Sequence, residues 1–186
     1  MKKLFDFSLS LCALILLAIP MLVIAASIKR TSKGPALYWS NRVGKNNHIF
    51  KMPKFRTMRT DTPALATHLL EEPDKYVTRI GRLLRKTSLD ELPQLLSILK
   101  GDMSFVGPRP ALYNQDDLIE LRTRQGIHRL MPGLTGWAQI NGRDELPILV
   151  KVDFDHYYLL NRSFLLDMKI ILQTVFKVLL REGVNH

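Results

Sequence analysis

The chain lacks the residues on which several kinds of protein depend. Cys12 is its only cysteine and lies within an apolar run, which excludes a disulfide framework and a thiolate metal site. No internal repeat or low-complexity segment occurs in its 186 residues. Its cations are not interleaved with aromatic residues as a stacking surface for bases would require. We therefore expect no nucleic-acid partner, and one domain of moderate core with an appended segment.

Acidic residues are absent between Phe7 and Thr60, although many cations lie in this stretch and the chain carries a net charge of +10. A basic block beside a membrane segment contributes on the order of 1 kcal/mol per residue to binding of anionic lipid. It also attracts anionic substrates, and its simplest alternative is a solvated face. The cations of this stretch are Lys29, Arg30, Lys33, Arg42, Lys45, Lys51, Lys54, Arg56 and Arg59.

Charge of either sign is missing from Phe7 to Ile28, a run of 22 residues. As a straight helix this run would be about 33 Å long, enough to cross a hydrocarbon core of roughly 30 Å. We expect membrane association, but three arrangements fit: a spanning helix kinked at Pro20, a re-entrant hairpin with two arms, or a cleaved signal peptide ending before Ala26. Basic residues on both flanks set no orientation.

The rest of the chain has the pattern of a small α+β domain in which helices predominate. Short strands are expected at 36–39 and 48–51, around a turn at 44–47. Residues 164–180 are amphipathic at helical spacing, which suits either a core helix or a helix at the bilayer surface. The remaining expectations are a loop or short helix at 61–75, helices at 75–85 with an arginine stripe, 116–129 and 144–161, and a loop with a short strand at 131–143.

An acidic pair, Asp90 and Glu91, stands between cationic residues and a stiff arginine loop. Ser88 and Glu91 have the spacing of a capping box, which predicts a helix beginning at or just before Asp90. The free N–H groups of a helix start favour ionised Asp90 and attract phosphate oxygens. Gly-Pro-Arg-Pro at 107–110 holds Arg109, and an arginine held in this way can bind phosphate bidentately. The layout is that of a phosphate-handling site.

Three other acidic pairs compete with this one: Asp116 with Asp117, Asp153 with Asp155, and Asp144 with Glu145. The last lies in a second Asp-Glu-Leu-Pro, at 144–147. The ordinary role of such pairs is surface solvation or helix-start charge. Only the pair at 90–91 has both cations on the preceding helix and the arginine loop shortly after it. An aspartate of ordinary pKa near 4 is ionised at pH 7 and can attack phosphorus without a base.

In this context the sequence resembles the bacterial sugar transferases, the monotopic phosphoglycosyl transferases that begin glycan assembly on polyprenyl phosphate, in their compact form. The resemblance covers nearly the whole chain and rests on Arg42–Lys45, Lys54–Met58, Ser88–Leu95, Lys100–Ser104, Val106–Pro110 and Pro132–Arg143.

The resemblance implies transfer of sugar 1-phosphate from a UDP-sugar to undecaprenyl phosphate with release of UMP. It makes Asp90 the nucleophile that forms a covalent phosphosugar intermediate, and Glu91 its partner at Mg²⁺, with both carboxylates associated with the metal. It also implies work at the cytoplasmic face of the bacterial inner membrane. The residues expected to bind phosphate or substrate are Arg109, Lys54, Arg56, Arg85 and Arg143.

The family's membrane segment is a re-entrant helix, so the resemblance favours the hairpin at Pro20. One departure is Ile19 before Pro20, where relatives often have serine, so a hydroxyl that could satisfy freed backbone groups is missing. The expected organisation is a membrane hairpin at 1–30 and a catalytic domain at 31–186, with amphipathic interfacial helices. The alternative function is a non-catalytic, membrane-anchored basic protein that binds anionic lipid or an assembly partner. The sequence identifies neither the sugar nor the oligomeric state.

Overall fold

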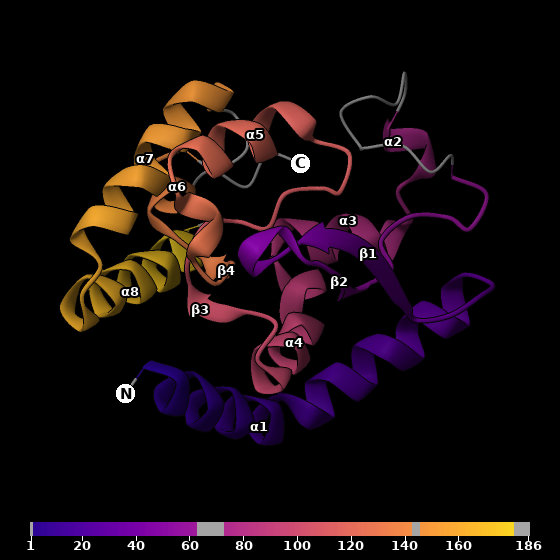
Figure 1. Cartoon of the computed structure of the whole chain (residues 1–186). Coiled ribbons are helices and arrows are strands. Elements are labelled where there is room, and N and C mark those ends of the chain that lie inside the picture. Colours follow the sequence, from indigo (N-terminus) through magenta and orange to yellow (C-terminus); the bar gives the residue numbers. More distant parts are fainter. Residues whose placement is uncertain (1, 63–72, 143–145, 181–186) are drawn as a thin grey trace.

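The computed structural model describes residues 2–62, 73–142 and 146–180 (Figure 1). It is mostly helical, with a long apolar N-terminal helix beneath a small α/β domain, which agrees with the predicted predominance of helices. The elements are α1 (Lys2–Thr31), β1 (Leu37–Val43), η1 (Lys45–Asn47), β2 (Ile49–Phe55), α2 (Pro73–Tyr76), α3 (Arg79–Lys86), η3 (Leu89–Gln94), α4 (Leu95–Lys100), β3 (Ser104–Val106), α5 (Asp116–Arg124), η4 (Ile127–Arg129), β4 (Gly133–Thr135), α6 (Trp137–Ile140), α7 (Ile148–Asn161) and α8 (Phe164–Leu180).

Helix α1 is long and apolar enough to cross a membrane by length and composition. Its 30 residues form one continuous helix through Pro20, so no non-helical residue separates two arms. The helix nevertheless bends, and its two halves run in different directions in Figure 1. Pro20 has no N–H to donate within the helix, and loss of that hydrogen bond accounts for a bend near it.

One side of α1 packs along the domain. Leu14 and Leu17 contact the cluster around Leu95 and Ile98, and Ile28 is buried with Leu84. The other side exposes large apolar side chains: Leu4, Phe7, Leu11, Ile15, Leu16, Ile19, Leu22 and Val23. The helix therefore lies against the domain and offers a continuous apolar surface on its far side.

Strands β1 and β2 form the predicted hairpin, with Leu37 opposite Phe55 and Val43 opposite Ile49. The turn uses left-handed backbone at Asn46 and Asn47 (φ 55° and 62°), a conformation that asparagine adopts more readily than most residues. The second strand runs longer than predicted and ends at Phe55, which places Lys54 beside η3.

Strands β3 and β4 form a parallel pair; β4 is the short strand predicted within 131–143, whereas β3 and the pairing were not predicted. Their connection passes through α5, which lies in the domain above them (Figure 1). Gly107 must be glycine because a Cβ there would lie 2.2 Å from the Met131 carbonyl oxygen, and one at Gly133 would lie 2.1 Å from the Gly107 nitrogen. This close approach fixes the start of the loop that carries Arg109.

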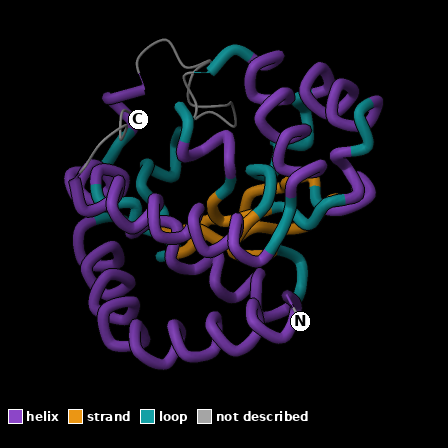
Figure 2. Tube along the Cα trace, turned by 90° about the vertical axis from the view of Figure 1, so that its left-hand side faces the viewer, coloured by secondary structure: helices purple, strands orange, loops and turns teal. Residues whose placement is uncertain are grey.

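The main core lies between these strands and the helices α5, α7 and α8. Figure 2 shows the strands in the interior of the domain with helices around them. Helix α8 has the predicted bounds; Ile170 on it is fully buried, whereas Leu165, Leu172 and Phe176 are exposed. Helix α5 ends earlier than predicted because Gly126, in left-handed conformation, turns the chain into η4.

Candidate active site

Asp90 and Glu91 lie in the short 3-10 helix η3, and α4 begins only at Leu95. A helix therefore begins just before Asp90 as predicted, but it is a 3-10 helix, and the predicted capping box is wrong. Ser88 is left-handed (φ 56°) and its side chain makes no capping hydrogen bond, while its carbonyl oxygen accepts from the Glu91 nitrogen at 3.2 Å. The Glu91 carboxylate is held by cations from other elements, which leaves it unavailable for a helix cap.

Glu91 brings three elements together. Its Oε1 lies 3.0 Å from Lys54 Nζ, on β2, and 3.0 Å from Arg109 Nη2, in the loop after β3. Burial opposes ionisation of this carboxyl group, but Arg109 and Lys54 outweigh it, so the pKa of Glu91 lies well below its usual range. The three side chains are 17–28 % exposed, so solvent or a ligand can reach them.

The pKa of Asp90 shifts in the opposite direction from that of Glu91, although the two residues are adjacent in the chain. It is 8 % exposed, and its Oδ1 has no hydrogen-bond partner among the residues that the structure describes. Burial raises the pKa of Asp90 to about 6; Glu91 adds to the rise, whereas Lys54, Arg85 and Arg109 oppose it. The expectation of a pKa near 4 is thus wrong because it omitted burial. At pH 7 the ionised form of Asp90 still exceeds the protonated form about tenfold.

The predicted phosphate-binding cations divide into two groups. Lys54, Arg85 and Arg109 act on the acidic pair, and Arg85 on α3 also donates from Nε to Thr57 Oγ1 at 3.0 Å. Arg56 is not brought to the pair. It is 6 % exposed, and its guanidinium donates to backbone oxygens at the end of α1 and to the Ser32 hydroxyl at 2.6–3.1 Å. Arg143, together with 144–145 of the second acidic tetrapeptide, lies outside the described residues.

Two buried residues behind the Arg109 loop form a pair that the sequence did not predict, although Asp155 was one of the competing acidic residues. Arg122 on α5 donates from Nε and Nη2 to Asp155 Oδ2, on α7, at 3.0 and 2.6 Å. Its Nη1 donates to the Arg109 carbonyl oxygen at 2.8 Å. The available signal was helical position, since Arg122 is four residues after buried Leu118 and Asp155 three after buried Val152.

The residues can hold a divalent cation only with help from a ligand. Among the described residues no three His, Cys, Asp or Glu side chains cluster. Mg²⁺, however, is commonly held by one or two carboxylates together with substrate phosphates. Asp90 and Glu91 supply two carboxylates, and the unbonded Asp90 Oδ1 fits that role.

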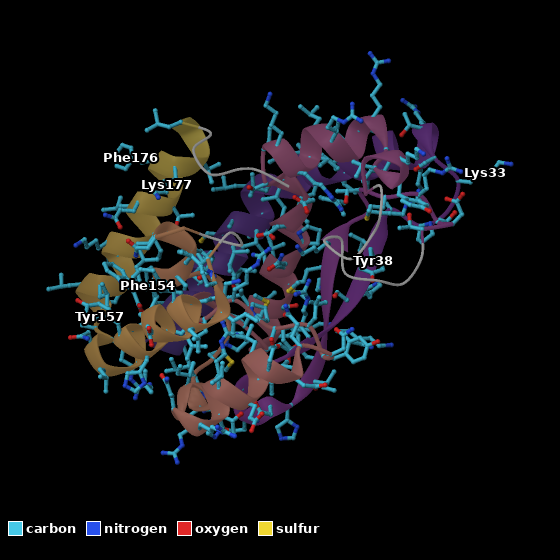
Figure 3. The ribbon with its side chains drawn as sticks, turned by 90° about the horizontal axis from the view of Figure 1, so that it is seen from above. Lys33, Tyr38, Phe154, Tyr157, Phe176 and Lys177 are labelled. Atoms are coloured by element: carbon cyan, nitrogen blue, oxygen red, sulfur yellow. The ribbon has the colours of Figure 1, made fainter. Side chains whose placement is uncertain are left out.

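Trp137 is engaged within the domain. Its ring stacks on Tyr157 at a centroid distance of 5.2 Å, and Lys169 Nζ lies 5.7 Å from its centroid. Figure 3 shows Tyr157 with Phe154 and Phe176 on the opposite side of the molecule from Tyr38 of the hairpin. Trp137 is therefore packed against side chains of α7 and α8.

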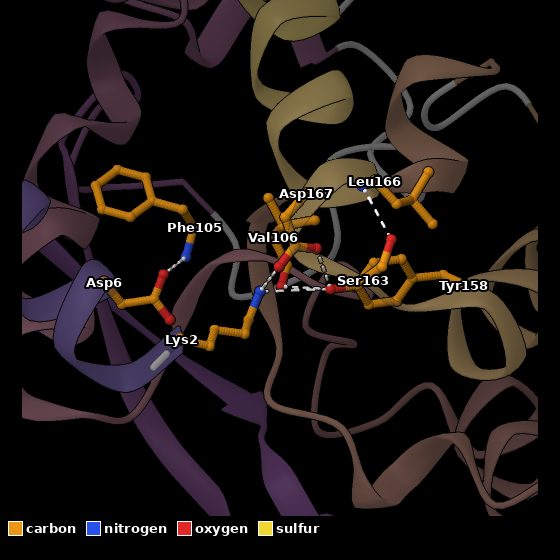
Figure 4. A network of polar contacts seen from close by, with 8 residues as sticks. All are labelled: Lys2, Asp6, Phe105, Val106, Tyr158, Ser163, Leu166 and Asp167. Atoms are coloured by element: carbon orange, nitrogen blue, oxygen red, sulfur yellow. Dashed lines mark hydrogen bonds and ion pairs between the residues drawn. The ribbon is translucent and has the colours of Figure 1, made fainter.

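A polar stripe on the first turns of α1 also docks on the domain (Figure 4). Asp6 Oδ1 accepts from the Phe105 nitrogen at 3.3 Å, and Lys2 forms an ion pair with Asp167. Asp167 accepts from the Tyr158 hydroxyl at 2.6 Å. Burial raises the pKa of Tyr158, and Asp167 raises it further, so the phenol stays protonated and donates.

The long apolar helix suggests membrane association, and the acidic pair lies among cations from β2, α3 and the loop after β3. Comparison with known proteins identifies the family. The model of the bacterial sugar transferases matches residues 1–181, and the chain belongs to this family. The predicted resemblance and the prediction of a transferase are thereby confirmed.

The relatives are of two lengths. The uncharacterized sugar transferase EpsL of Bacillus subtilis (strain 168) is 42 % identical over 189 residues, covering 100 % of this chain and 91 % of its own. The undecaprenyl-phosphate glucose phosphotransferase of Komagataeibacter xylinus is 41 % identical over 187 residues, but only 35 % of it is covered. The UDP-N-acetylgalactosamine-undecaprenyl-phosphate N-acetylgalactosaminephosphotransferase of Aeromonas hydrophila is 36 % identical over 184 residues, covering 96 % of this chain and 43 % of its own. The chain thus spans about two fifths of these longer relatives.

Proposed function

We propose that this protein transfers sugar 1-phosphate from a UDP-sugar to undecaprenyl phosphate through an aspartyl intermediate on Asp90, releasing UMP. The observation that carries the proposal is the state of Asp90: a buried carboxylate with an unbonded oxygen, next to a glutamate that two cations hold. Two of the relatives described above are named for phosphotransfer to undecaprenyl phosphate, which supports the same reaction.

The reaction is two displacements at one phosphorus. An Asp90 oxygen bonds to the phosphorus that carries the sugar, and the bond from that phosphorus to the bridging oxygen breaks, so UMP leaves with the bridging oxygen and its electron pair. An oxygen of the lipid phosphate then attacks the same phosphorus and breaks the acyl phosphate bond. The products are the lipid pyrophosphate sugar and free Asp90.

Both displacements bring anions together, and the cations around Asp90 oppose that repulsion. Lys54 and Arg109 are exposed enough to exchange part of their contact with Glu91 for phosphate oxygens, and Arg85 adds a third positive charge. Asp90 and Glu91 would hold Mg²⁺, which supplies Lewis-acid stabilisation of phosphate charge when bound.

We further propose that α1 is a re-entrant membrane helix whose two ends lie on the cytoplasmic side. The support is that both ends are tied to the same domain: Lys2 contacts Asp167, and Arg56 binds the carbonyl oxygens of Ser32 and Lys33. A straight crossing would place two ends of a 30-residue helix about 45 Å apart, on opposite faces of the bilayer. The apolar side chains exposed on α1 and α8 would then enter one leaflet.

Asp90→Asn tests the chemistry, with exposed Asp116→Asn as the matched control. The protein is assayed in membranes for UMP release from a panel of UDP-sugars with undecaprenyl phosphate. Loss of release in Asp90→Asn, with membrane binding and the control unaffected, is expected. Unchanged release would exclude Asp90 as the nucleophile, and absence of release from the unaltered protein on every sugar would favour the lipid-binding alternative.

A cysteine-accessibility scan tests the topology. Cys12→Ser removes the chain's only cysteine, and Lys3→Cys and Lys33→Cys then place single thiols at exposed positions near the two ends of α1. A membrane-impermeant thiol reagent added to sealed inverted vesicles should label both positions. Labelling of only one would refute the hairpin.

A further inference from the structure

The loop that carries Arg109 is held along its whole backbone. Four successive carbonyl oxygens, those of residues 108–111, each accept a hydrogen bond. The donors are the Gly133 nitrogen at 2.9 Å, Arg122 Nη1 at 2.8 Å, Arg42 Nη1 at 3.2 Å and the Val43 nitrogen at 2.9 Å. Two of these donors, Arg42 and Arg122, are charged side chains, and the buried carboxylate of Asp155 orients Arg122.

The geometry of this contact is rigid. The guanidinium of Arg122 is planar, and three of its N–H groups are committed: two to Asp155 Oδ2 and one to the Arg109 carbonyl. Asp155 is 1 % exposed and Arg122 is 8 % exposed, so water does not compete for these bonds. The position of the Asp155 carboxylate therefore fixes the position of the Arg109 backbone.

Stability alone is a weak reason for such a pair. Apolar residues of similar volume often replace a buried ion pair at no cost in stability, because the charges lose their hydration. What apolar residues cannot do is hold a particular backbone carbonyl at a fixed distance. The carbonyl that Arg122 holds belongs to Arg109, whose side chain lies 3.0 Å from Glu91 Oε1. The position of the loop backbone and the geometry of the acidic pair are therefore coupled.

We propose that Arg122 and Asp155 are positioning residues: they set where the Arg109 guanidinium lies relative to Asp90 and Glu91, and hence to the substrate phosphate. The proposal rests on the function proposed above. It assigns to α5 and α7, which supply neither member of the acidic pair, the alignment of a cation in the site.

Arg122→Lys is the first test. Lysine keeps the positive charge but has no planar guanidinium with which to bind Asp155 and the Arg109 carbonyl oxygen at the same time. Misplacement of a reacting group by about 1 Å costs on the order of 10²-fold, so kcat for UMP release should fall by about that factor, and by more than KM rises. Arg124→Lys, on the same helix with a side chain 71 % exposed, is the control and should leave both constants unchanged.

A double-mutant cycle with Arg109→Met separates positioning from a general structural role. If Arg122 acts through Arg109, the double variant should be no slower than Arg109→Met alone. If the two losses multiply, Arg122 acts independently of Arg109 and the proposal is wrong.

Hydrogen exchange supplies a readout that does not depend on turnover. In Asp155→Asn, the peptide covering 107–112 should exchange faster than in the unaltered protein, while helix α3 at 79–86, which makes none of the four contacts to this loop, should not change. Asp153→Asn, an exposed neighbour on α7, is the control. Faster exchange without any UMP release from the unaltered protein would support the coupling and refute the proposed function. Unchanged exchange at 107–112 would overturn the positioning proposal. This test uses Asp155→Asn, so it still decides the proposal if Arg122→Lys fails to fold.

Discussion

Two ion-pair clusters meet at Arg109 and differ in their access to solvent. On the side of η3, Glu91, Lys54 and Arg109 have side chains 17–28 % exposed. On the side of α5 and α7, the side chains of Arg122 and Asp155 are 9 % and 2 % exposed. The first cluster can exchange partners with an incoming phosphate, whereas the second cannot. In the functions proposed above, the same pairing of arginine with carboxylate would serve binding where it is open and alignment where it is sealed.

The largest predicted effect breaks the sealed cluster. Asp155→Ala leaves a buried guanidinium without its carboxylate, so the free energy of unfolding should fall by about 3–5 kcal/mol. Denaturant unfolding in detergent micelles measures this change. Glu120→Ala, which removes an exposed i,i+4 ion pair with Arg124, should cost only about 0.3–0.5 kcal/mol. Equal losses in both variants would contradict the contrast between sealed and open pairs.

The next effect removes the residue that the two clusters share. If Arg109 donates to phosphate as proposed, Arg109→Met should lower kcat for UMP release by about 10²–10³-fold, because a charge-stabilising donor is lost from the site. The free energy of unfolding should change much less than in Asp155→Ala, since the backbone carbonyl of residue 109 remains. Steady-state kinetics and the same unfolding assay test both statements, and a collapse of stability with kcat preserved would reverse the assignment.

The smallest effect concerns pH and acts on the open cluster. Asp90 must be ionised to attack, and its pKa is about 6, so kcat/KM should fall as the pH is lowered through 6. Lys54 lowers this pKa, so Lys54→Met should move the acid limb to higher pH. Lys51→Met, an exposed cation on the same strand, is the control. A limb that moves to lower pH, or that moves equally in the control, would refute the role of Lys54.

Sequence patterns predicted the elements whose periodicity is local. The alternation and turn at 36–51 gave the hairpin, and the apolar spacing of 164–180 gave α8 with its observed bounds. The parallel pairing of β3 with β4 was not predicted because each strand has only three residues, too few for a period, and their partners lie far apart in the sequence.

The site was predicted less completely, and the errors have a common cause. Glu91 has capping-box spacing, but long-range cations hold its carboxylate, and Arg56 lies in a cationic motif yet binds the end of α1. Asp90 has an ordinary local sequence, and burial by distant elements raises its pKa. Spacing along the chain does not report tertiary partners, so the acidic pair could be proposed from the sequence, whereas its electrostatics could not be predicted.

The polar stripe on α1 places a requirement on that helix beyond its length. Lys2, Asp6 and Ser10 follow one another at intervals of four, and the last two are buried against the domain. A bilayer responds mainly to how far an apolar segment reaches, and one inserted residue would extend α1 by only about 1.5 Å. The same insertion after Ser10 would rotate the stripe by about 100° relative to the later turns. Insertions and deletions in α1 must therefore keep the polar stripe facing the domain. Tolerated changes in the length of this helix should come in steps of whole turns.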